Sequence, residues 1–144
     1  WLDASFPIMV SFSDYLDSYR EEIKYESRRH HRFAIDTLNG RHIGNCMYYN
    51  INERNREAEL GIMIGDRSYW DKGYGSDTVT ILVGHIFKTT KLERVYLKTL
   101  SSNIRAQRCF EKCGFSPVKG ANRGGHRFLV MELYRSHFEG NTER

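Results

Sequence analysis

The chain of 144 residues contains 40% hydrophobic and 13% aromatic residues, a composition typical of a folded domain and unlike that of a disordered chain. No apolar run reaches the roughly 20 residues that a membrane-spanning helix needs, and the start WLDASFPIMV lacks the basic region and cleavage site of a signal peptide. The net charge of +4 suits an anionic ligand but is too small to indicate nucleic acid on its own.

The first third of the chain predicts a helix followed by a hairpin. Apolar residues recur at helical spacing over about residues 12–29. The basic run 28–32 that follows is interpreted as cations at the negative end of the helix dipole. An RNA contact is the alternative, but no aromatic platform accompanies the run. Strands are expected over 32–36 and 42–50, joined by a turn at Asn39-Gly40.

The rest of the chain predicts alternating strands and helices. Strands are expected at 58–65, 94–100, 115–120 and 126–133, and helices at 76–90 and 103–112. This order predicts one α/β domain over residues 1–144, with a mixed sheet, flanking helices and a parallel strand–helix–strand unit. Because the chain begins at Trp1 and not at Met, we expect it to be truncated at its N-terminus.

Three cysteines, Cys46, Cys109 and Cys113, cannot all pair in disulfides, so a reducing cytoplasm is the expected compartment. Cys109 and Cys113 stand four residues apart on a predicted helix, which is a possible metal-ligand spacing. No second Cys/His pair stands at ligand spacing, and we therefore expect no metal site.

A glycine-containing turn precedes the helix at 76–90. It reads Trp70-Asp71-Lys72-Gly73-Tyr74-Gly75-Ser76. Glycine allows positive φ and close approach of a ligand, and a helix start presents unpaired N–H groups that attract anions. Thr78 stands where the dinucleotide fingerprint needs its third glycine, and the P-loop pattern is also missing. The turn therefore predicts a phosphate site of another class.

Two segments resemble the signatures of the GNAT family of acetyl-CoA-dependent N-acetyltransferases. The family loop Gln/Arg-x-x-Gly-x-Gly/Ala reads 70–75 here, with Trp70 at its first position, as in the branch that acetylates ribosomal-protein N-termini, polyamines and aminoglycosides. The second signature is similar to residues 103–106 followed by 109–115. The resemblance implies a GNAT-like domain with splayed parallel central strands. The family's first strand is not evident.

The resemblance also implies a site for acetyl-CoA as co-substrate. The pantetheine arm is expected along the backbone of Met63, Ile64 and Gly65, with Asn103 on the other side and Phe110 against the thioester. Asn103 is equally explained as a helix N-cap. The amides expected to hold the pyrophosphate belong to Trp70, Asp71, Lys72, Gly73, Tyr74, Gly75 and Ser76.

Glu59 is the expected general base. An alkyl ammonium of pKa near ~10.4 must lose a proton before it attacks, and the family places a glutamate at this position, with a water relaying the proton. An exposed charge at a strand end is the alternative, and Glu57 on the same strand face is the second candidate. The backbone N–H near Met63 is the expected oxyanion donor.

Phe110 departs from the family pattern, because many members place a proton-donating tyrosine there. A thiol of pKa near ~8.5 still leaves readily as its anion. Cys113 is an alternative acid, although a core position explains it better. His85 is expected to be structural. His126 either touches the acceptor or occupies a surface position on its strand. Tyr48, Tyr49 and Trp70 either shape an acceptor pocket or are core aromatics.

We therefore expect a cytoplasmic N-acetyltransferase in which a primary amine attacks acetyl-CoA directly. The acceptor is a small-molecule amine or a protein N-terminus, without membrane or nucleic-acid partners, and the family resemblance allows a homodimer. A non-catalytic acyl-CoA-binding protein on the same fold is the first alternative, motivated by Phe110. A nucleic-acid-binding module that uses the basic run is the second.

Overall fold

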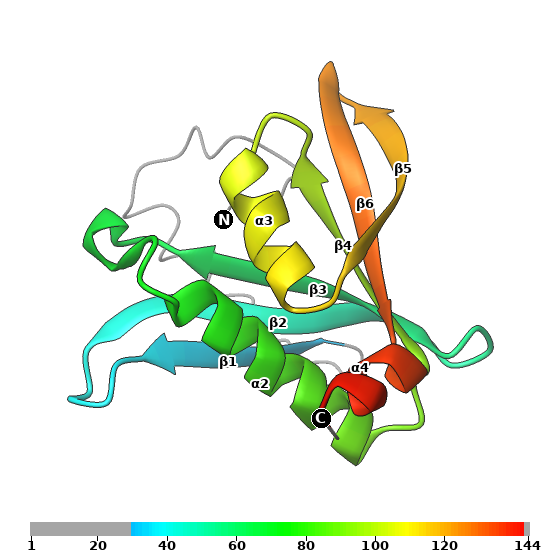
Figure 1. Cartoon of the computed structure of the whole chain (residues 1–144), viewed down its shortest axis with the longest axis horizontal. Helices are drawn as coiled ribbons and strands as arrows, with labels where there is room; N and C mark the ends of the chain where they lie inside the picture. The colour runs from blue at the N-terminus through cyan, green and yellow to red at the C-terminus, as the bar shows by residue number, and fades with distance from the viewer. Residues whose placement is uncertain (1–29, 143–144) are drawn as a thin grey trace.

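The computed structural model describes residues 30–142 (Figure 1). The helix predicted at 12–29 and the first two residues of the basic run, Arg28 and Arg29, lie outside these residues. Within them, no helix is long and apolar enough to cross a membrane. No group of three or more His, Cys, Asp or Glu side chains in the same residues is placed to share a metal ion.

Within residues 30–142, six strands form one mixed sheet in the order β1-β2-β3-β4-β6-β5. All neighbours pair antiparallel except β3 and β4, which pair parallel, as the sequence pattern predicts. The sheet therefore consists of two antiparallel halves joined along one parallel seam. The strands are β1 (His31–Asp36), β2 (His42–Asn52), β3 (Glu57–Ile64), β4 (Arg94–Leu100), β5 (Ser116–Arg123) and β6 (His126–Tyr134).

The seam between β3 and β4 is short. Only three residue pairs join the two strands, and the last of them is Glu59 opposite Tyr96. Beyond this pair the strands diverge, as Figure 1 shows. The splay expected between the central parallel strands is thus present, with Glu59 at its closed end.

Helices α2 (Tyr74–Thr89) and α3 (Ile104–Lys112) pack on the same face of the sheet (Figure 1). The apolar side predicted for α2 is the side it buries. Its buried residues are Val79, Leu82, Val83, Ile86 and Phe87. They join the core with every second residue of β3, from Ala58 to Ile64. Strand alternation therefore turns Glu57 and Glu59 to the opposite face.

Two further elements were not predicted: a 3₁₀ turn η1 (Arg67–Tyr69) and the helix α4 (Arg135–Thr142). Tertiary contacts hold α4 in place. Phe138 packs on Phe87 with ring centroids 5.6 Å apart, and the Arg135 guanidinium donates to the carbonyl oxygens of Phe87, Thr90 and Leu92. A cation at these carbonyls stabilises the end of α2.

Candidate functional site

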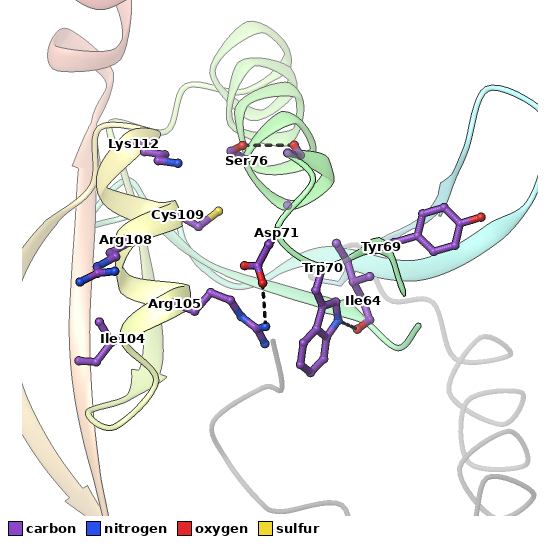
Figure 2. Close-up of a pocket in the computed structure, with 12 residues that line it drawn as sticks. Ile64, Tyr69, Trp70, Asp71, Ser76, Ile104, Arg105, Arg108, Cys109 and Lys112 are labelled. Carbon is purple, nitrogen blue, oxygen red and sulfur yellow. Dashed lines mark hydrogen bonds and ion pairs between the residues drawn. The ribbon is translucent and has the colours of Figure 1, made fainter. Parts of the chain in front are cut away.

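A cavity of about 440 Å³ opens between the start of α2 and the helix α3, at the far end of β3. Figure 2 shows its lining side chains. Six residues of the predicted coenzyme site line it, whereas Met63, Gly65, Lys72, Tyr74, Asn103 and Phe110 do not. The lining residues are Ile64, Tyr69, Trp70, Asp71, Gly73, Gly75, Ser76, Ile104, Arg105, Arg108, Cys109 and Lys112.

The glycine turn is the N-terminus of α2. Gly73 is the N-cap residue, with φ of 89° in the left-handed region that favours glycine. The first helical bond runs from Asp77 N–H to Gly73 O, at 3.0 Å. The amides of Tyr74, Gly75 and Ser76 before it have no acceptor within the helix. Gly75 does not have positive φ, so backbone conformation does not require a glycine there.

The α3 side of the cavity is basic. Arg105, Arg108 and Lys112 all line it, and their spacing of three and four residues places them along one side of the helix. We did not predict these residues as part of the site. Basic residues at helical spacing directly after Asn103 were the signal that could have indicated them. Cations opposite unpaired helix amides make the cavity suitable for a diphosphate.

Arg105 reaches across the cavity to the turn (Figure 2). Its guanidinium nitrogen lies 3.4 Å from a carboxylate oxygen of Asp71, and its Cζ lies 3.9 Å from the centroid of the Trp70 ring. The Asp71 side chain is 67% exposed, and exposed ion pairs contribute little stability. Arg105 can therefore exchange this carboxylate for a phosphate at small cost.

The open edge of β3 has a definite register. Gly65 N–H donates to Ile43 O on the β2 side, at 3.1 Å. Because backbone groups alternate along a strand, Met63 also faces β2, and Ile62 and Ile64 face the splay. Trp70 Nε1 donates to Ile64 O at 2.8 Å. The expectation that Met63 and Gly65 offer backbone groups to a pantetheine arm is therefore corrected to Ile62 and Ile64.

Glu59 is buried, with 5% of its surface exposed, so the alternative of an exposed charge at a strand end is wrong. Its Oε2 accepts a hydrogen bond from Tyr49 Oη at 2.9 Å. Its Oε1 accepts one from Asn50 Nδ2 at 3.2 Å and lies 3.7 Å from Lys98 Nζ. A carboxylate with these partners is held in position at the floor of the splay.

Tyr96, opposite Glu59 in the ladder, stays protonated to higher pH than usual. Burial raises the pKa of its phenol, and the negative charges of Glu59 and Glu57 raise it further. Its hydroxyl therefore keeps its proton and can donate a hydrogen bond to Glu59. Glu57 differs from Glu59, because it accepts a 2.7 Å bond from Arg94, which also binds Glu132 at 2.6 Å. This ion-pair network leaves Glu57 the weaker candidate base.

Asn103 and Phe110 have structural positions. Asn103 Oδ1 accepts a bond from Ala106 N–H at 3.2 Å and caps α3, which confirms the N-cap interpretation. Phe110 is 4% exposed and packs on Phe115 in the core, with ring centroids 6.0 Å apart. The expectation that Phe110 lies against a ligand arm is not supported, since it does not line the cavity.

The two cysteines of α3 differ in their environments. The Cys113 thiol has its pKa lowered to about 7 by a hydrogen bond from Cys109 and, to a smaller extent, one from Thr80, against the effect of burial. The same contact raises the pKa of Cys109, and burial adds to it. Cys113 is therefore the cysteine able to exchange a proton near neutral pH.

The tyrosines and histidines considered for an acceptor pocket have different environments. Tyr48 is buried in the core and Tyr49 contacts Glu59. His85 and His126 are exposed. A second hollow, of about 1570 Å³, lies at the end of the sheet away from the glycine turn, and Tyr49, Asn50 and His85 are among its lining residues. This hollow is separate from the cavity at α3, and it borders two residues that bind Glu59 but not Glu59 itself.

Comparisons with known proteins agree with this arrangement. The family model described as "Acetyltransferase (GNAT) domain" matches residues 9–116. A probable spermine N(1)-acetyltransferase of Bacillus subtilis subsp. natto is 28% identical over 96 residues, and the match covers 63% of each chain. The chain thus spans less than two thirds of this curated relative.

Solved structures share the fold. Spermidine N-acetyltransferase from Vibrio cholerae, in complex with CoA and spermine, superposes with a TM-score of 0.77 at 21% identity, over 93% of this chain and 81% of that one. The aminoglycoside acetyltransferase AAC(6')-Ib in complex with coenzyme A gives a TM-score of 0.66 at 24% identity, over 74% and 67% of the two chains.

Proposed function

The chain belongs to the GNAT acetyltransferase family, and from this membership we propose that it transfers an acetyl group from acetyl-CoA to a primary amine. The observation that carries the proposal is the opened seam of the sheet. A buried carboxylate, Glu59, lies at its closed end, and a basic, amide-lined cavity lies at its open end. These two features match the two halves of the reaction, which are proton removal and coenzyme binding.

The hydrogen-bond donors and cations that line the cavity suit the phosphates of coenzyme A. The N-terminal amides of α2, from Tyr74 to Ser76, would hold the diphosphate, with Arg105 and Lys112 supplying positive charge. The backbone of Ile62 and Ile64 would bond the pantetheine amides in the manner of an added strand. Trp70 lines the cavity beside Ile64, held there by the hydrogen bond from its indole to Ile64 O.

The chemistry requires one base and one donor. Glu59 would accept the proton of the acceptor ammonium, directly or through a water. An N–H group of Ile62 or Ile64, facing the splay, would stabilise the oxyanion. Phe110 has no proton to give, so the thiolate of coenzyme A would leave as an anion of pKa near ~8.5. No covalent enzyme intermediate is needed, and no Cys–His pair is described at the site.

The proposed acceptor is a polyamine or another small alkylamine. The curated relative is named for spermine. The second hollow is lined in part by Tyr49 and Asn50, which are hydrogen-bond partners of Glu59. A protein N-terminus is the second candidate acceptor. The free cysteines suit the cytoplasm as the proposed compartment, and the family allows a homodimer.

The test is an acceptor screen with the whole purified chain. Acetyl-CoA is supplied with spermine, spermidine, an aminoglycoside, amino acids and N-terminal peptides, and both free thiol and acetylated amine are measured. We expect the two products in equal amounts for at least one amine. If acetyl-CoA binds in calorimetry but no amine releases thiol, the non-catalytic acyl-CoA-binding alternative is the correct one.

A further inference from the structure

Lys98 on β4 places its own amine beside the proposed base. Its Nζ lies 3.7 Å from Glu59 Oε1, and its side chain is 43% exposed, against 6% for Glu59. Among the ion pairs between residues 30–142, this is the only one that involves a lysine. We propose that Lys98 is an acetylation site of this chain, modified by the chain's own active site.

The position of Lys98 follows from the strand register. Tyr96 is the last β4 residue that pairs with β3, and Lys98 lies two residues further, so its side chain is on the same face as those of Tyr96 and Glu59. Lys98 therefore lies beside the open part of the splay. An acceptor amine that gives its proton directly to Glu59 must occupy this neighbourhood, and the Lys98 ammonium already does.

The step rests on the proposed function and needs no reactant beyond acetyl-CoA. The Lys98 ammonium gives one proton to Glu59, and the freed lone pair of Nζ attacks the thioester carbonyl carbon. The new C–N bond forms as the C–S bond breaks, and Nζ loses a second proton. The thiolate takes up one proton, so the products are Nζ-acetyl-Lys98, coenzyme A thiol and one net proton.

Acetylation would change the charge around the base. The modified side chain is neutral, so Glu59 would keep its bonds to Tyr49 and Asn50 but lose the ion pair with Lys98. An acceptor ammonium would then no longer compete with a resident cation for the carboxylate. Self-acetylation would in this way prepare the site for an external amine.

The experiment incubates the purified whole chain with acetyl-CoA and no added amine, and locates acetyl groups by peptide mass spectrometry. Lys119 is the matched control. Lys98 on β4 and Lys119 on β5 both pair with Val130 of the strand between them. Lys119 is therefore on the same face of the sheet as Lys98, roughly 10 Å away. Lys98→Arg keeps the charge and removes the acceptor, and acetyl-CoA binding of each variant reports that it is folded.

We expect Lys98 to be acetylated at least about tenfold faster than Lys119, at a rate per chain independent of protein concentration. The Lys98→Arg variant should lose the modification and Lys119→Arg should retain it. Glu59→Gln should slow it about 100-fold, the lower range for loss of a general base.

Three results would overturn the inference: acetylation of Lys98 no faster than of Lys119, a rate per chain that rises with protein concentration, or an unmodified Lys98. If Lys98 stays unmodified, measuring thiol release with an external amine shows whether only the Lys98 proposal or also the proposed function has failed. If the amine is acetylated, only the Lys98 proposal is wrong. If acetyl-CoA neither binds nor reacts, the proposed function is wrong as well.

Discussion

Replacing Glu59 by glutamine removes the proposed base while preserving its shape. The amide oxygen of Gln can still accept the hydrogen bond that Tyr49 gives to the carboxylate. The Gln amide nitrogen cannot accept the bond from Asn50 Nδ2, and losing that bond costs about 1 kcal/mol, because Asn50 is exposed and its amide can turn to water. The ion pair with Lys98 is lost, but that lysine is partly exposed and 3.7 Å away, and such pairs contribute below about 1 kcal/mol. The substitution should therefore affect proton transfer far more than folding.

The size of the effect follows from the acceptor. An amine of pKa near ~10.4 is neutral in a fraction of about 0.0004 at pH 7 and about 0.3 at pH 10. Without a base, only this neutral fraction reacts, so kcat/KM of Glu59→Gln should rise about tenfold per pH unit. The wild-type advantage should be up to about 10³ at pH 7, within the range for general bases, and below about tenfold at pH 10.

The assay follows thiol release from acetyl-CoA at a series of amine concentrations, so that kcat/KM is obtained at each pH from about pH 6.5 to about pH 10, after subtraction of spontaneous hydrolysis. Glu57→Gln is the control, because Glu57 lies on the same strand and face but is bound to Arg94. Its deficit should be small and independent of pH. Parallel profiles for wild type and Glu59→Gln would refute the assignment, and a pH-dependent deficit in Glu57→Gln would transfer it to Glu57.

Three further outcomes are expected. Gly75→Val should raise the Kd for coenzyme A, measured by calorimetry, at least about tenfold, because the branched side chain would fill the cavity that Gly75 lines. An unchanged Kd would show that the glycine turn is not part of the coenzyme site. Cys113, with its pKa lowered to about 7, should be alkylated with a midpoint near that pH, before Cys46, whose pKa burial raises to about 11; equal rates would contradict this. Ile86→Ala, at a site 0% exposed, should lower the free energy of unfolding by about 2–5 kcal/mol, whereas Ile81→Ala, at 72%, should change it by less than about 0.5.

Local patterns were sufficient for most of the fold. The hairpin of β1 and β2 follows from Asn39-Gly40, where Gly40 has φ of 85°, and the buried side of α2 follows from helical periodicity. Helix α4 could not be predicted, because its segment contains Gly140 and an asparagine, which are weak helix formers. Its position depends on Phe138 and Arg135 contacting a distant helix.

Part of the candidate site could likewise be predicted from local sequence and part could not. The glycine turn and Glu59 could be predicted, because the turn carries a recognisable motif and Glu59 stands at a fixed distance before it. Which residues of β3 face the splay depends on pairing with β2, and a shift of one residue exchanges Met63 for Ile62. The packing of Phe110 in the core and the reach of Arg105 to Asp71 depend on side chains far apart in sequence.

The three-pair seam has a consequence for the whole molecule. On the described residues, the sheet is two antiparallel blocks, β1-β2-β3 and β4-β6-β5, tied to each other by little main-chain bonding. A ligand bound between the two blocks would pair with the main chain as an added strand does and would connect them. Binding of the proposed acetyl donor would then stabilise the folded protein, by about 2.7 kcal/mol at a hundredfold excess over Kd.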